Sequence, residues 1–155
     1  MVGLYLGFAD LLRAGITRTM PKLAAVQSAA CDPIYHAWAA CAPDIAAAQK
    51  KATIAEGISV AKPVRGAAIL QAIRESGGLV RTVTDHAIWD MVEALGKQGI
   101  YVEPTAAAAP AAFAGLRENG TIGSSDRVVI LLTGSGLKAT DKIVEHFRSR
   151  EAVSV

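Results

Sequence analysis

The sequence predicts an α/β fold of three layers, in which helices flank a mostly parallel sheet. Segments with apolar residues at helical spacing alternate along the chain with short runs rich in β-branched residues. One such run, Arg127 to Leu132, is apolar without alternation, which is typical of a strand buried on both faces of a parallel sheet. The length of 155 residues suits one ordinary domain, so we expect a single α/β domain over residues 1–155.

The composition argues against several classes of function. Apolar residues make up 52% of the chain and charged residues 19%, and the formal charge of +2 comes from scattered basic side chains, which does not favour nucleic acid as a partner. No apolar run reaches the roughly 18 residues of a membrane span, and the start lacks a secretory signal, so we expect a cytoplasmic protein with no membrane partner. Cys31 and Cys41 lack metal-ligand spacing, and we expect buried or half-buried free thiols and no metal site.

Capping residues divide the chain into elements. Glycine after a stretch with helical periodicity stops a helix, and Asp or Thr before such a stretch caps its start. Thr53 to Val60 could be strand or loop. The expected elements are a helix ending at Ala14-Gly15, a strand over Lys22 to Ser28, a helix from Asp32-Pro33 through Trp38, a helix over Val64 to Ser76, a strand over Leu79 to Val83, a helix behind Thr84-Asp85, an alanine-rich helix between Glu103-Pro104 and Asn119-Gly120, and the strand over Arg127 to Leu132.

Three loops are candidates for a binding site, because ligands of open parallel sheets bind at the carboxyl ends of strands. The turn from Thr133 to Lys138 contains two glycines that let backbone approach a ligand, although it could be an ordinary turn. The stretch from Gly99 to Thr105 opens a helix whose amides could face a ligand, or it is only a helix cap. In the third loop, Glu56 stands beside Gly57 in an apolar run, and it could simply be solvated.

Taken together, these loops resemble one family. The segments that carry the resemblance occur in the same order and spacing: Thr53-Ile54-Ala55-Glu56-Gly57-Ile58, Lys62-Pro63-Val64-Arg65-Gly66, Glu75-Ser76-Gly77-Gly78, Gly99-Ile100-Tyr101-Val102-Glu103-Pro104, and Leu131-Leu132-Thr133-Gly134 with Gly136-Leu137-Lys138. The opening stretch also matches, so the likeness covers nearly the whole chain. The sequence is similar to threonine synthase, and specifically to its C-terminal portion.

The resemblance implies a pyridoxal-phosphate enzyme of the tryptophan synthase β superfamily, of which this chain would be an incomplete large domain. In that family, Thr133 matches the hydroxyl that bonds the pyridine nitrogen, Glu56-Gly57 matches a loop beside the ring, and Glu103 to Thr105 match a segment on its other side. Gly134, next to Thr133, is a further candidate for binding the cofactor. The Schiff-base lysine and the phosphate loop lie upstream in the family. The chain therefore contains no expected catalytic residue, and it is not expected to bind the cofactor covalently.

The leading interpretation is a C-terminal fragment of a threonine-synthase-like lyase of threonine biosynthesis, which converts O-phosphohomoserine to threonine and phosphate. The alternatives are a non-catalytic ligand-binding or interaction module, and the C-terminal half of a split serine/threonine dehydratase-like enzyme. The expected partner is the missing N-terminal half, or another copy of the chain in an oligomer. Many relatives differ at Ser135 and around Thr105 and Ala106, which leaves the choice of substrate open.

Overall fold

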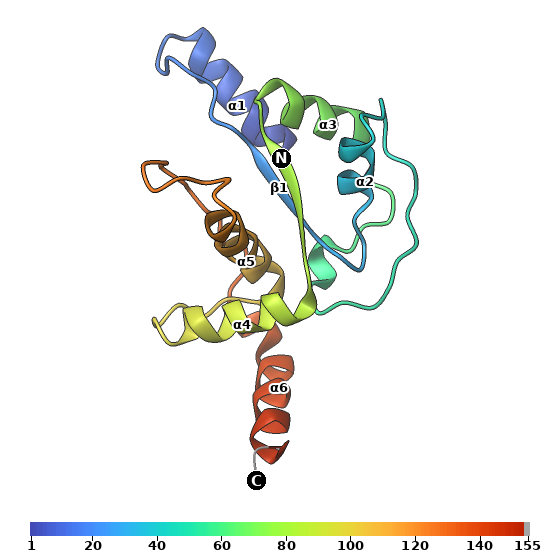
Figure 1. Ribbon diagram of the computed structural model, residues 1–155, viewed down its shortest axis with the longest axis vertical. Helices are drawn as coiled ribbons and strands as arrows, with labels where there is room; N and C mark the ends of the chain where they lie inside the picture. Colours follow the sequence, from blue (N-terminus) through green and yellow to red (C-terminus); the bar gives the residue numbers. More distant parts are fainter. Residues whose placement is uncertain (154–155) are drawn as a thin grey trace. The chain divides into compact units, whose positions relative to one another are not determined.

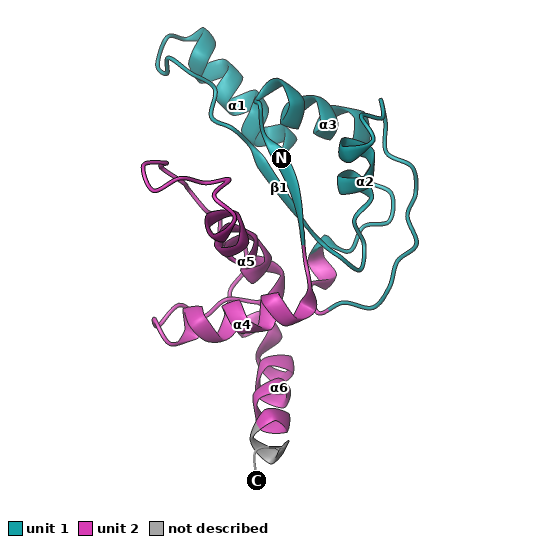
Figure 2. Cartoon of the chain, viewed as in Figure 1, with its two compact units in different colours: residues 1–53, 58–82 teal, residues 54–57, 83–155 magenta. Residues whose placement is uncertain are grey.

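The computed structural model describes residues 1–153, the last three by their backbone alone. The chain forms two compact units (Figure 2). Unit 1 comprises residues 1–53 and 58–82, and unit 2 comprises residues 54–57 and 83–155. The two units are compact parts of the chain, and the expectation that residues 1–155 form a single domain stays a prediction. No helix among the described residues has both the length and the apolar character needed to cross a membrane.

Unit 1 is built from helices packed on a small sheet (Figure 1). Its elements are α1 (Val2–Arg13), β1 (Ala24–Ser28), α2 (Pro33–Ala39), α3 (Gly66–Glu75) and β2 (Leu79–Val83), of which the last residue already belongs to unit 2. The strands β1 and β2 pair as a parallel sheet. Ala25 and Val80 bury one sheet face against Ile73 of α3, and Ile34 and Trp38 of α2 pack on the same cluster. This cluster is a core of the kind that the alternating pattern of elements predicts.

The segment that joins α3 to β2 lies against Leu23, the residue before β1. Gly77 adopts a φ of +63°, which favours glycine and ends α3. A Cβ on Gly78 would lie 2.1 Å from the carbonyl oxygen of Leu23, so only glycine fits there without a shift. The amide of Leu23 donates to Oγ of Ser76 at 3.2 Å. Cys31 is buried as expected, whereas Cys41 is exposed, and both are free thiols.

Unit 2 is centred on two packed helices, α4 (Asp85–Gly96) and α5 (Pro104–Glu118). The hydroxyl of Thr84 accepts the amide of Ala87 at 3.2 Å, which confirms the predicted cap of α4. Ile88 and Val92 are buried on α4, and the alanines of α5 are largely buried as well. Two further elements follow, the short helix η2 (Gly136–Ala139) and α6 (Thr140–Val153). Neither of them was predicted from the sequence.

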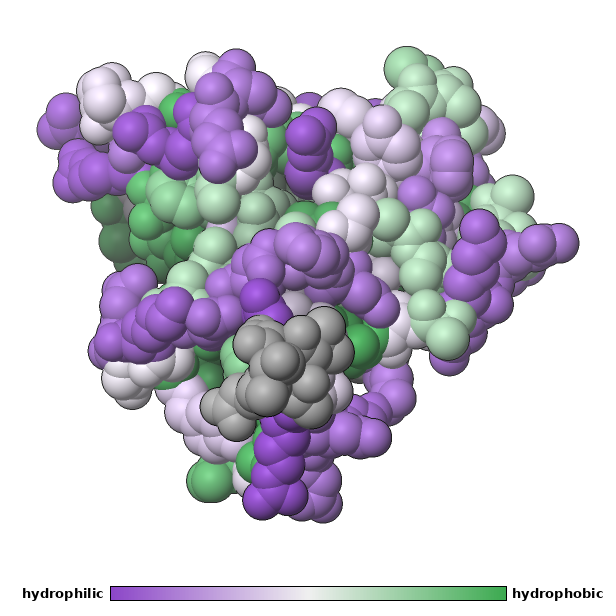
Figure 3. All heavy atoms as spheres, turned by 60° about the horizontal axis from the view of Figure 1, so that its bottom comes forward, coloured by the Kyte–Doolittle hydropathy of each residue, from purple (hydrophilic) through white to green (hydrophobic). Residues whose placement is uncertain are grey.

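The predicted strand over Arg127 to Leu132 is wrong. These residues form no strand in the described part of the chain, and Val129 is 86% exposed. The only sheet within residues 1–153 contains β1 and β2, so this run has no neighbouring strand there to complete its hydrogen bonds. Val128, Leu131 and Leu132 are exposed as well. Figure 3 shows that hydrophobic residues lie beside hydrophilic ones on one face of the molecule.

Candidate functional site

The three candidate loops come together within unit 2. They border a pocket of about 460 Å³. The predicted site residues among its lining are Glu56, Gly57, Glu103 and Thr105, together with Pro104. Leu137 and Lys138 of the glycine-containing turn also line it. The pocket is thus built from segments that lie up to 88 positions apart in the sequence, from residue 54 to residue 142.

Polar contacts hold the loop containing Glu56 and Gly57 against the rest of unit 2. The amide of Ile54 donates to Oδ2 of Asp85 at 3.0 Å, and the amide of Gly57 donates to Oγ1 of Thr105 at 3.3 Å. The side chain of Thr105 lies so near Gly57 that a Cβ there would come within 3.1 Å of both its methyl and its hydroxyl. Gly57 is therefore the residue that allows this loop to approach the start of α5.

The two glycines of the Thr133 to Lys138 turn lie under side chains of the neighbouring loop. A Cβ on Gly134 would come within 1.8 Å of Oε1 of Glu103, and one on Gly136 within 2.8 Å of the ring of Tyr101. The amide of Glu103 donates to the carbonyl of Gly134 at 3.2 Å, and the amide of Gly136 donates to that of Tyr101 at 3.0 Å. The glycines do permit a close approach, but the atoms that approach belong to the protein itself.

Thr133 lies immediately before this clamped turn and is exposed. Neither Thr133 nor Gly134 is among the described residues that line the pocket. The carbonyl of Gly134 does accept a hydrogen bond from the amide of Glu103, and Glu103 lines the pocket. In the sequence, Thr133 stands four positions before Leu137, the first residue of this turn that lines the pocket. A hydrogen bond from its hydroxyl to a cofactor stays a prediction.

The contribution of α6 to the pocket was not predicted from the sequence. Lys142 lines it, and its Nζ lies 2.5 Å from Oε1 of Glu56. The sequence leaves open that Glu56 is simply solvated; its side chain is 72% exposed, so it is solvated and also ion-paired. The pair joins residues 86 positions apart, which no local pattern could have indicated. The signal that could have found α6 is the spacing of Ile143 and Phe147, one helical turn apart.

The pocket presents both signs of charge. Glu56, Glu103 and Asp141 supply carboxylates, and Lys138 and Lys142 supply ammonium groups. The first turn of α5, with Pro104 at its start, adds the positive end of a helix dipole. Such a wall can hold a polar ring between an apolar proline and fixed polar groups, and it can contact an anionic substituent through a lysine.

A family model described as pyridoxal-phosphate dependent enzyme matches residues 1–134. The chain belongs to this family. It is 35% identical over 146 residues to the threonine synthase of Methanosarcina acetivorans, a match that covers 94% of this chain and 36% of the relative. It is 36% identical over 139 residues to the threonine synthase of Methanocaldococcus jannaschii, covering 89% of this chain and 34% of the relative. The chain thus spans about a third of the length of these pyridoxal-phosphate enzymes, in their C-terminal part.

The fold of the chain is also found in solved structures. Maize serine racemase superposes with a TM-score of 0.64 at 21% identity, covering 89% of this chain and 42% of the racemase. A fungal L-serine ammonia-lyase from Rhizomucor miehei gives a TM-score of 0.64 at 19% identity, covering 86% of this chain and 43% of the lyase. The predicted α/β class, with a parallel sheet and only part of the whole fold present, is confirmed.

Proposed function

We propose that this chain forms one wall of the cofactor site of a threonine-synthase-like lyase. The observation that supports the proposal most is that the loops at residues 54–57, 101–105 and 134–138 meet at one pocket within one compact unit. The residues present fit the cofactor, because Pro104 supplies an apolar surface at the pocket, Glu103 and Thr105 supply polar groups, and Lys138 supplies an ammonium group. Thr133 supplies a neutral hydroxyl in the adjoining turn.

The chain's own residues would bind and orient the ring. Pyridoxal phosphate, when bound, supplies an electron sink that stabilises negative charge on a substrate carbon. A neutral hydroxyl at the pyridine nitrogen, in place of a carboxylate, does not favour protonation of that nitrogen. Thr133 would therefore temper the sink, which suits elimination and replacement reactions. Glu103 and Thr105 would keep the ring in place from the side on which α5 begins.

The substrate under this proposal is O-phosphohomoserine, and the products are threonine and phosphate. The reacting lysine and the groups that hold the cofactor phosphate would come from the N-terminal portion that the relatives possess, because no lysine of the matched segments falls at the position of the Schiff-base lysine. The partner under this proposal is that portion of the enzyme. The compartment under this proposal is the cytoplasm.

Complementation tests the proposal. The purified chain should form no stoichiometric adduct at one lysine when treated with pyridoxal phosphate and then borohydride. Mixed with the N-terminal two thirds of the Methanosarcina acetivorans relative, it should release phosphate from O-phosphohomoserine. A trapped single-site adduct on the isolated chain, or a stable complex that binds the cofactor and releases no phosphate, would overturn the proposal.

A further inference from the structure

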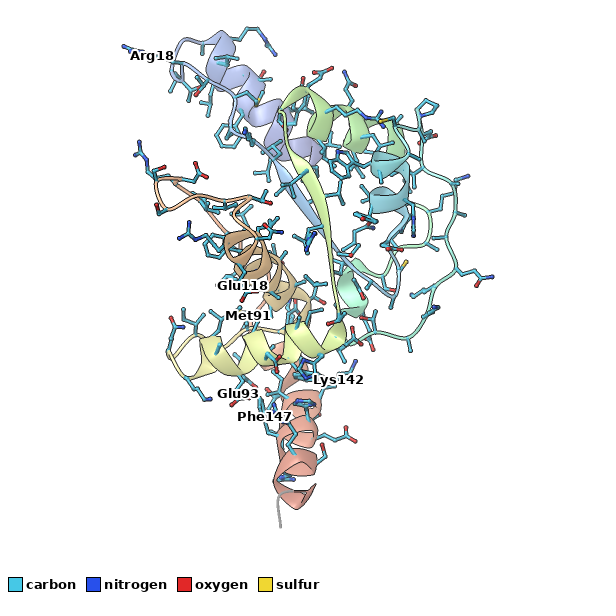
Figure 4. The ribbon with its side chains drawn as sticks, in the orientation of Figure 1. Arg18, Met91, Glu93, Glu118, Lys142 and Phe147 are labelled. Atoms are coloured by element: carbon cyan, nitrogen blue, oxygen red, sulfur yellow. The ribbon has the colours of Figure 1, made fainter. Side chains whose placement is uncertain are left out.

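Helix α6 lies on α4 through an aromatic stack. The rings of Trp89 and His146 are 3.9 Å apart at their centroids and nearly parallel, with an interplanar angle of 7°. Phe147 meets Trp89 edge to face with centroids 6.4 Å apart. One turn further, Nη1 of Arg150 lies 3.0 Å from Oε2 of Glu93. Figure 4 shows Glu93 on α4 beside Phe147 on α6. These contacts fix the orientation of α6 along its length.

The same orientation brings Lys142 to Glu56. Lys142 stands one turn before His146, at the end of α6 that borders the pocket. Residues 54–57 are held by Asp85 at the start of α4, by Thr105 at the start of α5 and by Lys142 at the start of α6. The first two contacts use backbone amides of the loop, whereas Lys142 contacts the side chain of Glu56, which lines the pocket.

We propose that Lys142 is a positioning residue, and that α6, docked through His146 on Trp89, is a latch that holds the Glu56-Gly57 loop at the pocket. The consequence for a bound cofactor rests on the proposed function. The latch itself is a property of the chain without any ligand, so it can be tested separately.

The docking of α6 should depend on pH. Burial of its ring lowers the pKa of His146, and Arg150 lowers it further, while Glu93 and Asp90 act in the opposite direction. Asp90 is itself 2.9 Å from Nδ1 of His86. Nε2 of His146 is buried and has no hydrogen-bond partner among the described residues, so a proton placed there would be poorly compensated.

The sign follows from the lowered pKa. An undocked His146 titrates near the ordinary value of 6.5, and a docked one titrates below it. The contribution of neutral His146 to docking is therefore fully present above 6.5 and is lost as the pH falls through the lowered value. Acid should release α6 and, with it, the hold of Lys142 on Glu56.

Amide hydrogen exchange of the 155-residue chain tests the latch. The amide to follow is that of Gly57, which donates to Thr105, and its protection factor corrects for the intrinsic effect of pH. At neutral pH, Lys142→Met should lower this protection by about two- to fivefold, the range expected for an exposed ion pair. The control Arg148→Met removes an exposed charge from the same helix and should leave the protection unchanged. The paired exchange Glu56→Lys with Lys142→Glu should restore it.

A second variant separates the stack from the ion pair. His146→Phe keeps a ring against Trp89 and cannot be protonated, so the protection of Gly57 should become independent of pH between about 5 and 7.5. His146→Gln, which lacks the ring, should give low protection of the Gly57 amide throughout this pH range. Unchanged protection in Lys142→Met, or a pH dependence that persists in His146→Phe, would overturn the latch. Neither measurement uses the cofactor, so the proposed function could fail while the latch stands.

Discussion

Gly134 and Gly136 occupy a turn whose neighbours leave no room for a side chain. Their environments differ in stiffness, because the Glu103 carboxylate over Gly134 is the end of a flexible side chain and the Tyr101 ring over Gly136 is rigid. The ring is also fixed by its hydroxyl, which donates to Oγ1 of Thr140 at 3.0 Å. An added methyl group should therefore be tolerated differently at the two positions.

Gly136→Ala should destabilise the chain by about 1–3 kcal/mol, the usual cost of overpacking. Gly134→Ala should cost less, because Glu103 can swing away, but it should move a carboxylate of the pocket. Urea unfolding compares the two variants, with Gly7→Ala as a control in α1, where a Cβ meets nothing within 4 Å. A larger loss for Gly134→Ala than for Gly136→Ala would contradict the geometry.

Thr133 can be tested in the complemented enzyme. Thr133→Val keeps the shape of the side chain and removes its hydroxyl, so the fold should survive while cofactor binding weakens by about 1 kcal/mol, the contribution of one hydrogen bond. Absorbance titration with pyridoxal phosphate measures the change. Ser135→Ala is the control, since its hydroxyl accepts the amide of Leu137 within the turn. Equal cofactor affinities for Thr133→Val and the unmodified chain would remove Thr133 from the site.

At the scale of elements, a hydrogen bond joins α1 to α3. The hydroxyl of Tyr5 donates to the carboxylate of Glu75. This bond is the main cause that raises the pKa of Tyr5 above 10.0 and the main cause that lowers the pKa of Glu75 below 4.5, with Gln71 assisting at Glu75. The bond needs a protonated phenol and an ionised carboxyl, so it should persist over the broad range between the two titrations.

Tyr5→Phe should therefore destabilise the chain most between about pH 5 and 9. The carboxyl contributes above its unfolded pKa and loses its effect as the pH falls through the lowered value. The phenol contributes below 10.0 and loses its effect as the pH rises through the raised value. Thermal unfolding across this range measures the difference. In a Glu75→Gln background the effect of Tyr5→Phe should no longer vary in acid, and a variation that remained would show another cause.

Elements with strong local signals could be predicted from the sequence, and elements that need a distant neighbour could not. The ends of α1 and α3 follow from Gly15 and Gly77, which adopt positive φ, and the start of α4 follows from the Thr84 cap. The run 127–132 has the composition of a strand, but a strand also needs a partner. Helix α6 has few apolar residues, so its periodicity is weak.

The candidate site divides in the same way. Its loops could be predicted because glycine, proline and capping residues mark them locally, and the family resemblance brought them together. The Lys142 contact with Glu56 could not be predicted, because it depends on how α6 lies on α4. The stack of Trp89 on His146 is equally invisible to spacing rules, since nothing in either local sequence indicates the other ring.

At the scale of the whole molecule, the exposed run 127–132 should promote self-association. Val129 is 86% exposed, and Leu131 and Leu132 are 53% and 42% exposed, in a segment without a strand partner among the described residues. An exposed segment with apolar side chains and no strand partner favours pairing between chains. Light scattering should show association that increases with concentration and decreases in Val129→Lys.

Val64→Lys is the matched control for this prediction. Val64 is fully exposed in unit 1, outside the run, so the substitution adds the same charge without altering the apolar segment. It should leave the association unchanged. A monomer at all concentrations, or an equal effect of the two lysine substitutions, would show that the run 127–132 does not drive association.

The path of the chain limits how its units could be exchanged or transplanted. Residues 54–57 belong to unit 2 although both of their flanks belong to unit 1, so the chain passes from one unit to the other after Thr53, Gly57 and Thr82. A chimaera that grafted only residues 83–155 from a relative would pair a foreign pocket with a native Glu56-Gly57 loop. Unit 2 is discontinuous in the sequence, so a chimaera that transfers the complete pocket must include residues 54–57 from the first half of the chain.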